Sequence, residues 1–183
     1  MLLYILLAMA LIIFLWIFTT YNSFIKSKEH VNEGWSGIDV QLKRRSDLIP
    51  NLVAVVKQYA THEKDTLEKV TSMRASAMSA QSIEGRANAE AGLTQALKTL
   101  FAVAENYPDL KANQNFLSLQ QDLGNIEQEL QLARRYYNGT ARNYNMLIQQ
   151  FPSNIIASFS NFKVTPYFEL ASNEEREVPQ IKF

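Results

Sequence analysis

The feature that most constrains this chain is an uninterrupted apolar segment at its N-terminus. Residues 2–18 are all apolar or aromatic, Thr19 and Thr20 extend the uncharged segment, and the first charged side chain is Lys26. At about 1.5 Å per residue, a helix over residues 2–20 spans roughly 28 Å, which matches a hydrocarbon core of about 30 Å. We therefore expect residues 1–20 to be a transmembrane anchor that contacts the lipid bilayer.

A cleaved signal peptide is the alternative interpretation of this segment. It requires basic residues ahead of the apolar run and a cleavage site with small residues. No Lys or Arg precedes the run, and the sequence Thr19-Thr-Tyr-Asn-Ser-Phe24 lacks that pattern. The sequence thus favours an uncleaved, single-pass anchor. Because lysines and arginines follow the anchor, the positive-inside rule predicts an outside N-terminus and a cytoplasmic body.

The composition of the body restricts its partners and its fold. Eighteen basic residues balance eighteen acidic ones, so nothing indicates the basic surface that nucleic acid requires. The chain has no cysteine, which excludes disulfides and thiolate chemistry. Six glycines and five prolines are few for the many turns of an all-β domain. The body is therefore expected to be helical.

A heptad pattern over residues 115–151 predicts the longest helix of the body. Its apolar positions recur every three or four residues, as expected for a helix with one buried stripe. We expect this helix to begin near Ala112 and to end before Pro152, because proline disfavours helical geometry in the preceding residue. The stripe consists of Phe116, Leu119, Leu123, Ile126, Leu130, Ala133, Tyr137, Thr140, Tyr144, Leu147 and Phe151.

Similar stripes predict three earlier helices, at about 21–48, 51–79 and 86–106. Pro50 is expected to kink or break the first rod, since proline removes one backbone hydrogen bond and clashes with the preceding turn. The fold class is thus all-α: a transmembrane helix, then an antiparallel bundle of long helices over residues 21–160. Residues 161–183 are expected to form an extended tail, with the period-two segment 178–183 at its end.

A search for catalytic and metal-binding patterns predicts neither. His62 and Glu63 begin an H-E motif, but the sequence continues Lys-Asp-Thr and lacks the second histidine of a zinc protease. The Glu-x-x-His pairs of a di-iron bundle are missing, and so is a glycine-rich phosphate loop. We therefore expect no cofactor, no metal and no enzymatic activity.

A charged cluster interrupts the apolar stripe of the first body helix. Arg45 occupies a stripe position, where a guanidinium is costly to bury unless it is paired. We predict Glu63 as its partner, and a surface pair between Asp39 and Lys43. One interpretation is a recognition surface, and the other, which we favour, is a polar contact that fixes the register of the bundle.

The segment Tyr107-Pro-Asp-Leu-Lys-Ala-Asn-Gln-Asn-Phe116 indicates a helix start rather than a ligand site. Asp109 is a candidate cap for the long helix, because its carboxylate can accept hydrogen bonds from free amides of the first turn. Asn113 and Asn115 are alternative caps.

Several of these segments together resemble the LemA family. They are the run from Trp35 through Arg44, Arg45, Pro50 and Asn51 to Leu52, and the segments 59–64, 107–116, 144–145, 151–152 and 178–183. The resemblance extends over nearly the whole chain from Tyr21 onward, and motifs of this length and order are highly specific. It implies a membrane-anchored helical bundle in bacteria, with its N-terminus outside and its body in the cytoplasm. It brings no known enzymatic activity.

Two classes of function remain open, with an enzyme as a remote third. The leading hypothesis is a membrane-tethered scaffold or adaptor that binds a second copy of itself or another membrane protein. The second is a sensor that holds a small anion between helices near Arg44, Arg45 and Asn51. The candidate structural or interaction cluster comprises Trp35, Asp39, Arg44, Arg45, Asp47, Pro50, Asn51, Glu63, Tyr107, Asp109 and Asn113.

Overall fold

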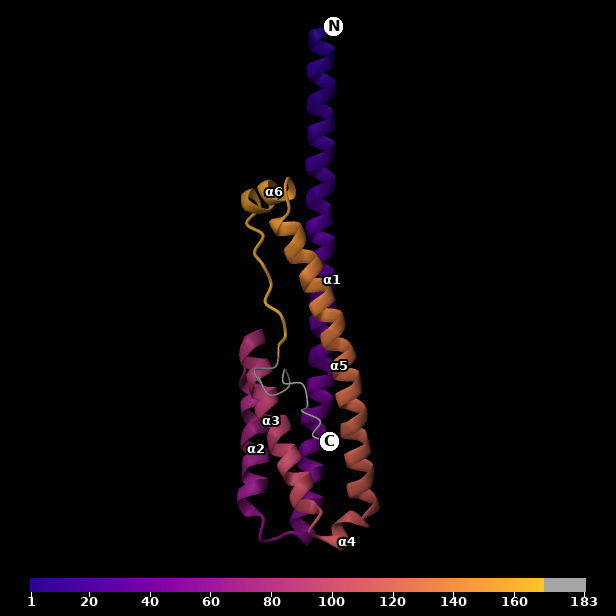
Figure 1. Cartoon of the computed structure of the whole chain (residues 1–183), viewed down its shortest axis with the longest axis vertical. Helices are drawn as coiled ribbons and strands as arrows, with labels where there is room; N and C mark the ends of the chain where they lie inside the picture. Colours follow the sequence, from indigo (N-terminus) through magenta and orange to yellow (C-terminus); the bar gives the residue numbers. More distant parts are fainter. Residues whose placement is uncertain (170–183) are drawn as a thin grey trace, which may run out of the picture. The chain divides into compact units, whose positions relative to one another are not determined.

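The computed structural model describes residues 1–169, which form helices joined by short turns, with no β-strand among them (Figure 1). The expected all-α fold is thus confirmed, while the segments 173–177 and 178–183 lie outside the described residues. The helices are α1 (Leu2–Tyr59), α2 (Lys64–Ser79), α3 (Ile83–Ala104), α4 (Pro108–Lys111), α5 (Gln114–Gln149) and α6 (Ser153–Phe159).

The N-terminal part of α1 has the properties of a membrane span. In the described part of the chain, α1 is the one helix long and apolar enough to cross a bilayer. Its most apolar window is not buried inside the protein, unlike a core helix of a water-soluble domain. The same helix continues past the apolar residues into the body without a linker.

The chain divides into two compact units, and the long helices α1 and α5 contribute residues to both. The first unit contains residues 1–38 and 132–167, and the described part of the second contains residues 39–131 and 168–169. The sequence-based division at residues 20 and 160 stays a prediction.

In the first unit, α1 packs against α5 through a mixture of aliphatic, aromatic and small residues. Phe24, Val31 and Ile38 of α1 are buried, as are Tyr137 and Tyr144 of α5. The two backbones approach closely at Gly34, where an added Cβ would lie 3.0 Å from the Cα of Tyr137. The predicted stripe of α5 thus supplies the core here, although its last member, Phe151, is 81% exposed.

The segment that follows α6 returns along the first unit and is held by specific contacts. The ring of Phe162 stacks on Phe24 with centroids 4.8 Å apart, and lies 5.8 Å from the ring of Tyr21. The Tyr137 hydroxyl donates to the carbonyl of Pro166 at 2.8 Å. The Asn145 side chain makes two hydrogen bonds of 2.8 Å with the backbone of Thr165, one as donor and one as acceptor. The return segment is therefore attached through neutral groups.

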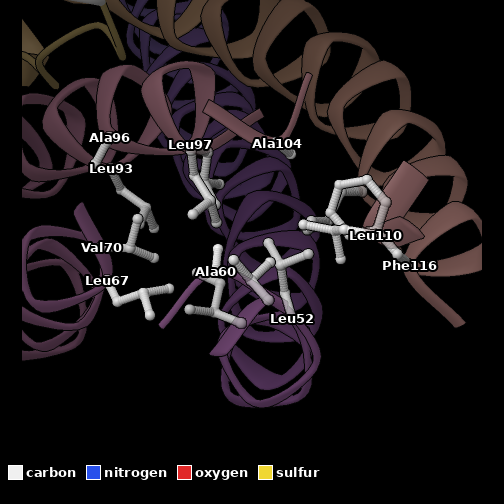
Figure 2. Packing of buried hydrophobic residues seen from close by; sticks show 14 of the residues in the cluster. Leu52, Ala60, Leu67, Val70, Leu93, Ala96, Leu97, Ala104, Leu110 and Phe116 are labelled. Atoms are coloured by element: carbon white, nitrogen blue, oxygen red, sulfur yellow. The ribbon is translucent and has the colours of Figure 1, made fainter. Parts of the chain in front are cut away.

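The second unit has an aliphatic core between α1, the α2–α3 hairpin and the start of α5. Helices α2 and α3 pack side by side, and Leu67 and Val70 of α2 point toward Leu93 and Leu97 of α3 (Figure 2). The core continues to the end of α1, α4 and the first turn of α5 through Leu52, Ala60, Leu110 and Phe116, all within 3% of full burial. Burying such side chains is worth roughly 1.5–3 kcal/mol each for the larger ones.

The prediction that Pro50 breaks the first helix is wrong. Helix α1 continues through Pro50 to Tyr59, and the chain turns instead at residues 60–63. Because Pro50 has no N–H, the carbonyl of Ser46 loses its usual helical donor. The Arg74 side chain of α2 replaces that donor, with its Nε 2.8 Å from the Ser46 oxygen. The Pro50 ring lies on the exposed side of the helix, so the core does not have to accommodate it.

Candidate functional site

A buried charged group of the second unit is Arg45, which lies at a position of α1 that faces the helical core. Its side chain is within a few per cent of full burial, and Glu90 of α3 beside it is even less exposed. Arg45 Nη1 lies 3.5 Å from Glu90 Oε2 and 3.3 Å from Glu127 Oε2 of α5, and Nη2 donates to Thr94 Oγ1 at 3.0 Å. The guanidinium therefore links three helices, α1, α3 and α5.

The predicted pairing of Arg45 with Glu63 is wrong, although the expectation that this arginine must be paired was sound. Glu63 lies in the turn after α1, more than four helical turns along the chain from Arg45, and accepts a hydrogen bond from the Tyr107 hydroxyl at 2.9 Å. A buried ion pair overcomes its desolvation cost only with good geometry and further hydrogen bonds. At Arg45 the Thr94 hydroxyl provides a hydrogen bond, while the two carboxylates provide opposite charge at 3.3 and 3.5 Å without a hydrogen bond to Nη1.

The charged residues around Arg45 form separate pairs on the surface of the second unit. Asp39 pairs with Arg86 of α3 at 2.8 Å, so the predicted pair between Asp39 and Lys43 is wrong. Lys43 instead pairs with Asp47 at 3.2 Å, one helical turn further along α1. Both Lys43 and Asp47 are exposed, and such pairs contribute little to stability.

The predicted anion pocket does not assemble around Arg44, Arg45 and Asn51. Arg44 is exposed, donates to Gln41 at 3.1 Å, and borders an open groove of about 690 Å³. That groove also contains the carboxylates of Asp47, Asp122 and Glu129, while neither Arg45 nor Asn51 lines it. Three carboxylates against one guanidinium make this surface unfavourable for an anion.

A second polar cluster surrounds the turn between α1 and α2. Besides the Tyr107–Glu63 hydrogen bond, Asn113 Nδ2 donates to the Tyr59 hydroxyl at 2.9 Å. Asn113 Oδ1 also accepts from the backbone N–H of Phe116 at 3.1 Å, so Asn113 caps α5 at its N-terminus. Asp109 lies in the first turn of the short helix α4, and its side chain is exposed. This cluster joins the ends of α1, α4 and α5.

The hydrogen bond to the Glu63 carboxylate raises the pKa of Tyr107 above its usual 10.0, because ionising the phenol would remove the donor and place two negative charges together. Trp35, in the first unit, makes an edge contact with Tyr137 with ring centroids 5.8 Å apart. Tyr107 and Trp35 thus each make structural contacts within their own unit.

Sequence reasoning missed the acidic partners of Arg45 and the basic partner of Asp39. Glu90 carried a detectable signal, because it lies at a stripe position of α3 together with Leu93, Leu97, Leu100 and Ala104. A carboxylate at such a position requires a buried cation. Glu127 and Arg86 lie beside their stripes and carried no such signal. Within residues 1–169, no group of three or more histidine, aspartate or glutamate side chains is arranged to hold a metal ion.

Comparison with known proteins identifies relatives of this chain. The model of the LemA family matches residues 34–183. The magnetosome proteins MamQ 1 and MamQ 2 of Paramagnetospirillum magneticum are each 26% identical to it over 175 residues, covering 81% of this chain and 64% of the relative. Protein LemA of Metamycoplasma hominis is 25% identical over 162 residues, covering 86% of this chain and 72% of that protein.

The chain spans 64% of the length of the MamQ relatives, so these have further sequence that it does not match. The family match, by contrast, includes the whole body from Gly34 onward, and with it both polar clusters described above. The all-helical body, the apolar first part of α1 and the family match agree, and the chain belongs to the LemA family.

Proposed function

We propose that this protein is a membrane-anchored, non-enzymatic scaffold or adaptor whose helical body binds a second copy of itself or another membrane protein. The observation that supports it most is the continuity of α1, whose 58 residues include both the apolar span and a core-forming part of the body. Because no linker separates the span from the body, the same helix would tether the body directly to the membrane, as a scaffold requires. Lys26 and Lys28 directly after the span favour a cytoplasmic body in a bacterial inner membrane.

The charged residues of the body support a structural rather than a catalytic interpretation. Arg45, Glu90 and Glu127 connect three helices, and Asp39 with Arg86 connects α1 to α3. Catalytic acids and bases are typically found in clefts with room for a substrate next to them. Arg45 and Glu90 instead contact neighbouring helices and are almost inaccessible to solvent. The names of the relatives, magnetosome protein MamQ and protein LemA, refer to no reaction.

Exposed apolar side chains on α5 support protein–protein contact in the first unit. Leu132 and Tyr136 are one helical turn apart, and about half of each side chain is exposed. Anchored proteins meet in two dimensions at high effective concentration, so a modest contact area gives stable association.

The test is cysteine crosslinking of the full-length protein, because the native chain has no cysteine and each introduced one is unique. Leu132→Cys is placed on the proposed contact near the middle of α5, and Gln114→Cys at the N-terminal end of α5 is the control. In liposomes, we expect a short bismaleimide to give dimers with Leu132→Cys whose yield persists as the protein is diluted with lipid. In native membranes, a partner of another kind gives an adduct of one defined mass. The proposal would be contradicted if the dimer yield were equal for both variants and fell in proportion to protein density, and if native membranes gave no such adduct.

A further inference from the structure

Two segments of the first unit lack charged residues and lie next to each other. One is the start of α1, where no charged side chain occurs before Lys26. The other is the uncharged stretch of residues 143–162, which contains the end of α5, all of α6 and Phe162. The charged residues that border these stretches, Lys26, Arg142 and Lys163, are all cationic and exposed.

Helix α6 is held beside the C-terminal end of the apolar span. A groove of about 480 Å³ separates them, and its lining is almost entirely apolar. From α1 it is lined by Phe14, Trp16, Ile17, Phe18 and Tyr21, and from α6 and the residue after it by Ile155, Ile156, Phe159 and Ser160. The stacking of Phe162 on Phe24 fixes the chain directly after α6 against the same part of α1. The position of α6 along the span is therefore set by packing.

The outward side of α6 and the turn before it presents large apolar side chains. Phe159 is 89% exposed and Phe151 is 81% exposed, while Ile156 and Ala157 face the protein and are buried. Exposed phenylalanines are unremarkable when scattered singly, but Phe159 lines the same groove as the exposed residues Phe14, Ile17 and Phe18 of α1. Together they form one apolar surface continuous with the span.

We propose that α6 and the preceding turn, residues 151–160, insert into the lipid interface beside the span and give the protein a second contact with the bilayer. The proposal rests on the span of the proposed function being embedded in lipid. A lipid surface is the occupant because the apolar face of α6 is continuous with side chains that a bilayer would surround. Amphipathic helices that carry phenylalanine or leucine on their apolar face bury that face at the boundary between headgroups and acyl chains. The cationic border of Lys26, Arg142 and Lys163 lies where acidic headgroups would be.

The experiment measures the depth of single labelled cysteines in the full-length protein. Phe159→Cys is labelled with an environment-sensitive fluorophore and reconstituted into liposomes of phosphatidylcholine and phosphatidylglycerol, with or without lipids that carry a quencher near the headgroup. Arg135→Cys is the matched control, since it lies in the same unit on an exposed face of α5, roughly 20 Å along that helix from its C-terminal end. We expect the Phe159→Cys probe to show blue-shifted emission and at least twofold quenching, and the control probe to show neither.

A probe at Phe14→Cys separates the failure of this inference from the failure of the anchor. If the Phe14→Cys probe is quenched by lipids labelled deep in the acyl chain while the Phe159→Cys probe stays unquenched, the anchor stands and the insertion of α6 is refuted. If the Phe14→Cys probe is also in water, both are refuted. A blue-shifted Phe159→Cys probe that no lipid quencher reaches indicates a covering protein, such as a second copy, and overturns the lipid assignment.

Discussion

The two units of this protein differ in the interactions that hold together segments distant in the sequence. In the second unit, the contacts between distant helices include ion pairs, with the buried Arg45 between Glu90 and Glu127 as the central one. In the first unit, which contains the apolar span, the return segment is held by neutral groups: the Tyr137 hydroxyl, the Asn145 amide and the ring of Phe162.

The difference follows from what each kind of contact costs and specifies. An ion pair costs desolvation but strongly penalises a wrong partner, so it suits a bundle in which several similar helices must align. Neutral hydrogen bonds and ring stacking cost less where the surroundings have a low dielectric, as they do next to a bilayer. The comparison thus predicts that the second unit depends on the charges of Arg45 and Glu90, whereas the return segment of the first unit depends on neutral hydrogen bonds and ring packing.

The largest expected effect comes from removing the buried cation of the second unit. Arg45→Met leaves Glu90 buried without its guanidinium, and breaking such a pair costs on the order of 3–5 kcal/mol. Urea unfolding of the detergent-solubilised protein, followed by circular dichroism, measures the loss. The double variant Arg45→Met with Glu90→Leu replaces both charges by apolar groups, and we expect it to recover most of the lost stability.

The exposed pair of Lys43 and Asp47 provides the control, because Lys43→Met should change stability by about 0.5 kcal/mol or less. A double variant as unstable as Arg45→Met alone would show that Arg45 does not act through Glu90. The assignment of charge as the main specifying contact of the second unit would then be wrong.

A smaller effect is expected where the first unit depends on shape. At Gly34 an added Cβ would meet the Cα of Tyr137 at 3.0 Å, and a backbone atom moves only with its helix. Gly34→Val is therefore expected to lower stability by about 1–3 kcal/mol through overpacking. Gly37→Ala, on the same helix, has nothing within 4 Å and should instead raise stability by up to about 1 kcal/mol. Thermal unfolding of both variants measures these shifts, and equal effects would contradict the close approach.

The smallest expected effect is a loss of folding stability at high pH. It has a different cause in each unit. In the first unit, burial raises the pKa of Tyr144, and in the second the hydrogen bond to Glu63 raises the pKa of Tyr107. A raised folded-state pKa contributes stability that is complete below the unfolded value of about 10 and is lost as pH rises through the folded value. The melting temperature should therefore fall above pH 10, and less steeply in Tyr144→Phe and Tyr107→Phe. Unchanged slopes in both variants would contradict these shifts.

Patterns of apolar residues predicted the helices well, whereas the choice of polar partners was beyond them. The stripe of α5 was predictable because burial recurs every three or four residues, and Leu123, Ile126, Leu130, Tyr137 and Tyr144 are indeed buried. That Arg45 needed a partner was also predictable, because a core position carried a charge. Which carboxylate pairs with it depends on the packing of α3 and α5 against α1, and sequence spacing contains no such information.

The same limit explains the error at Pro50. Local chemistry correctly indicated a lost hydrogen bond at that position, but the compensating donor, Arg74, is 28 residues from Ser46 along the chain. Sequence rules for proline describe an isolated helix, and here a neighbouring helix supplies what the isolated one lacks. Glu63 and Tyr107 were likewise recognised as notable, but only the fold shows that they bond to each other.

The bond from Arg74 to the Ser46 carbonyl makes the stiffness of α1 conditional. While α2 packs against α1, the Arg74 side chain supplies the hydrogen bond that Pro50 cannot donate, and α1 stays a continuous helix. If the α2–α3 hairpin separated from α1, the Ser46 carbonyl would lose this donor, and α1 would be more flexible near Pro50. Loss of the contact between α2 and α1 is therefore expected to allow bending at Pro50, far along the sequence from the membrane span.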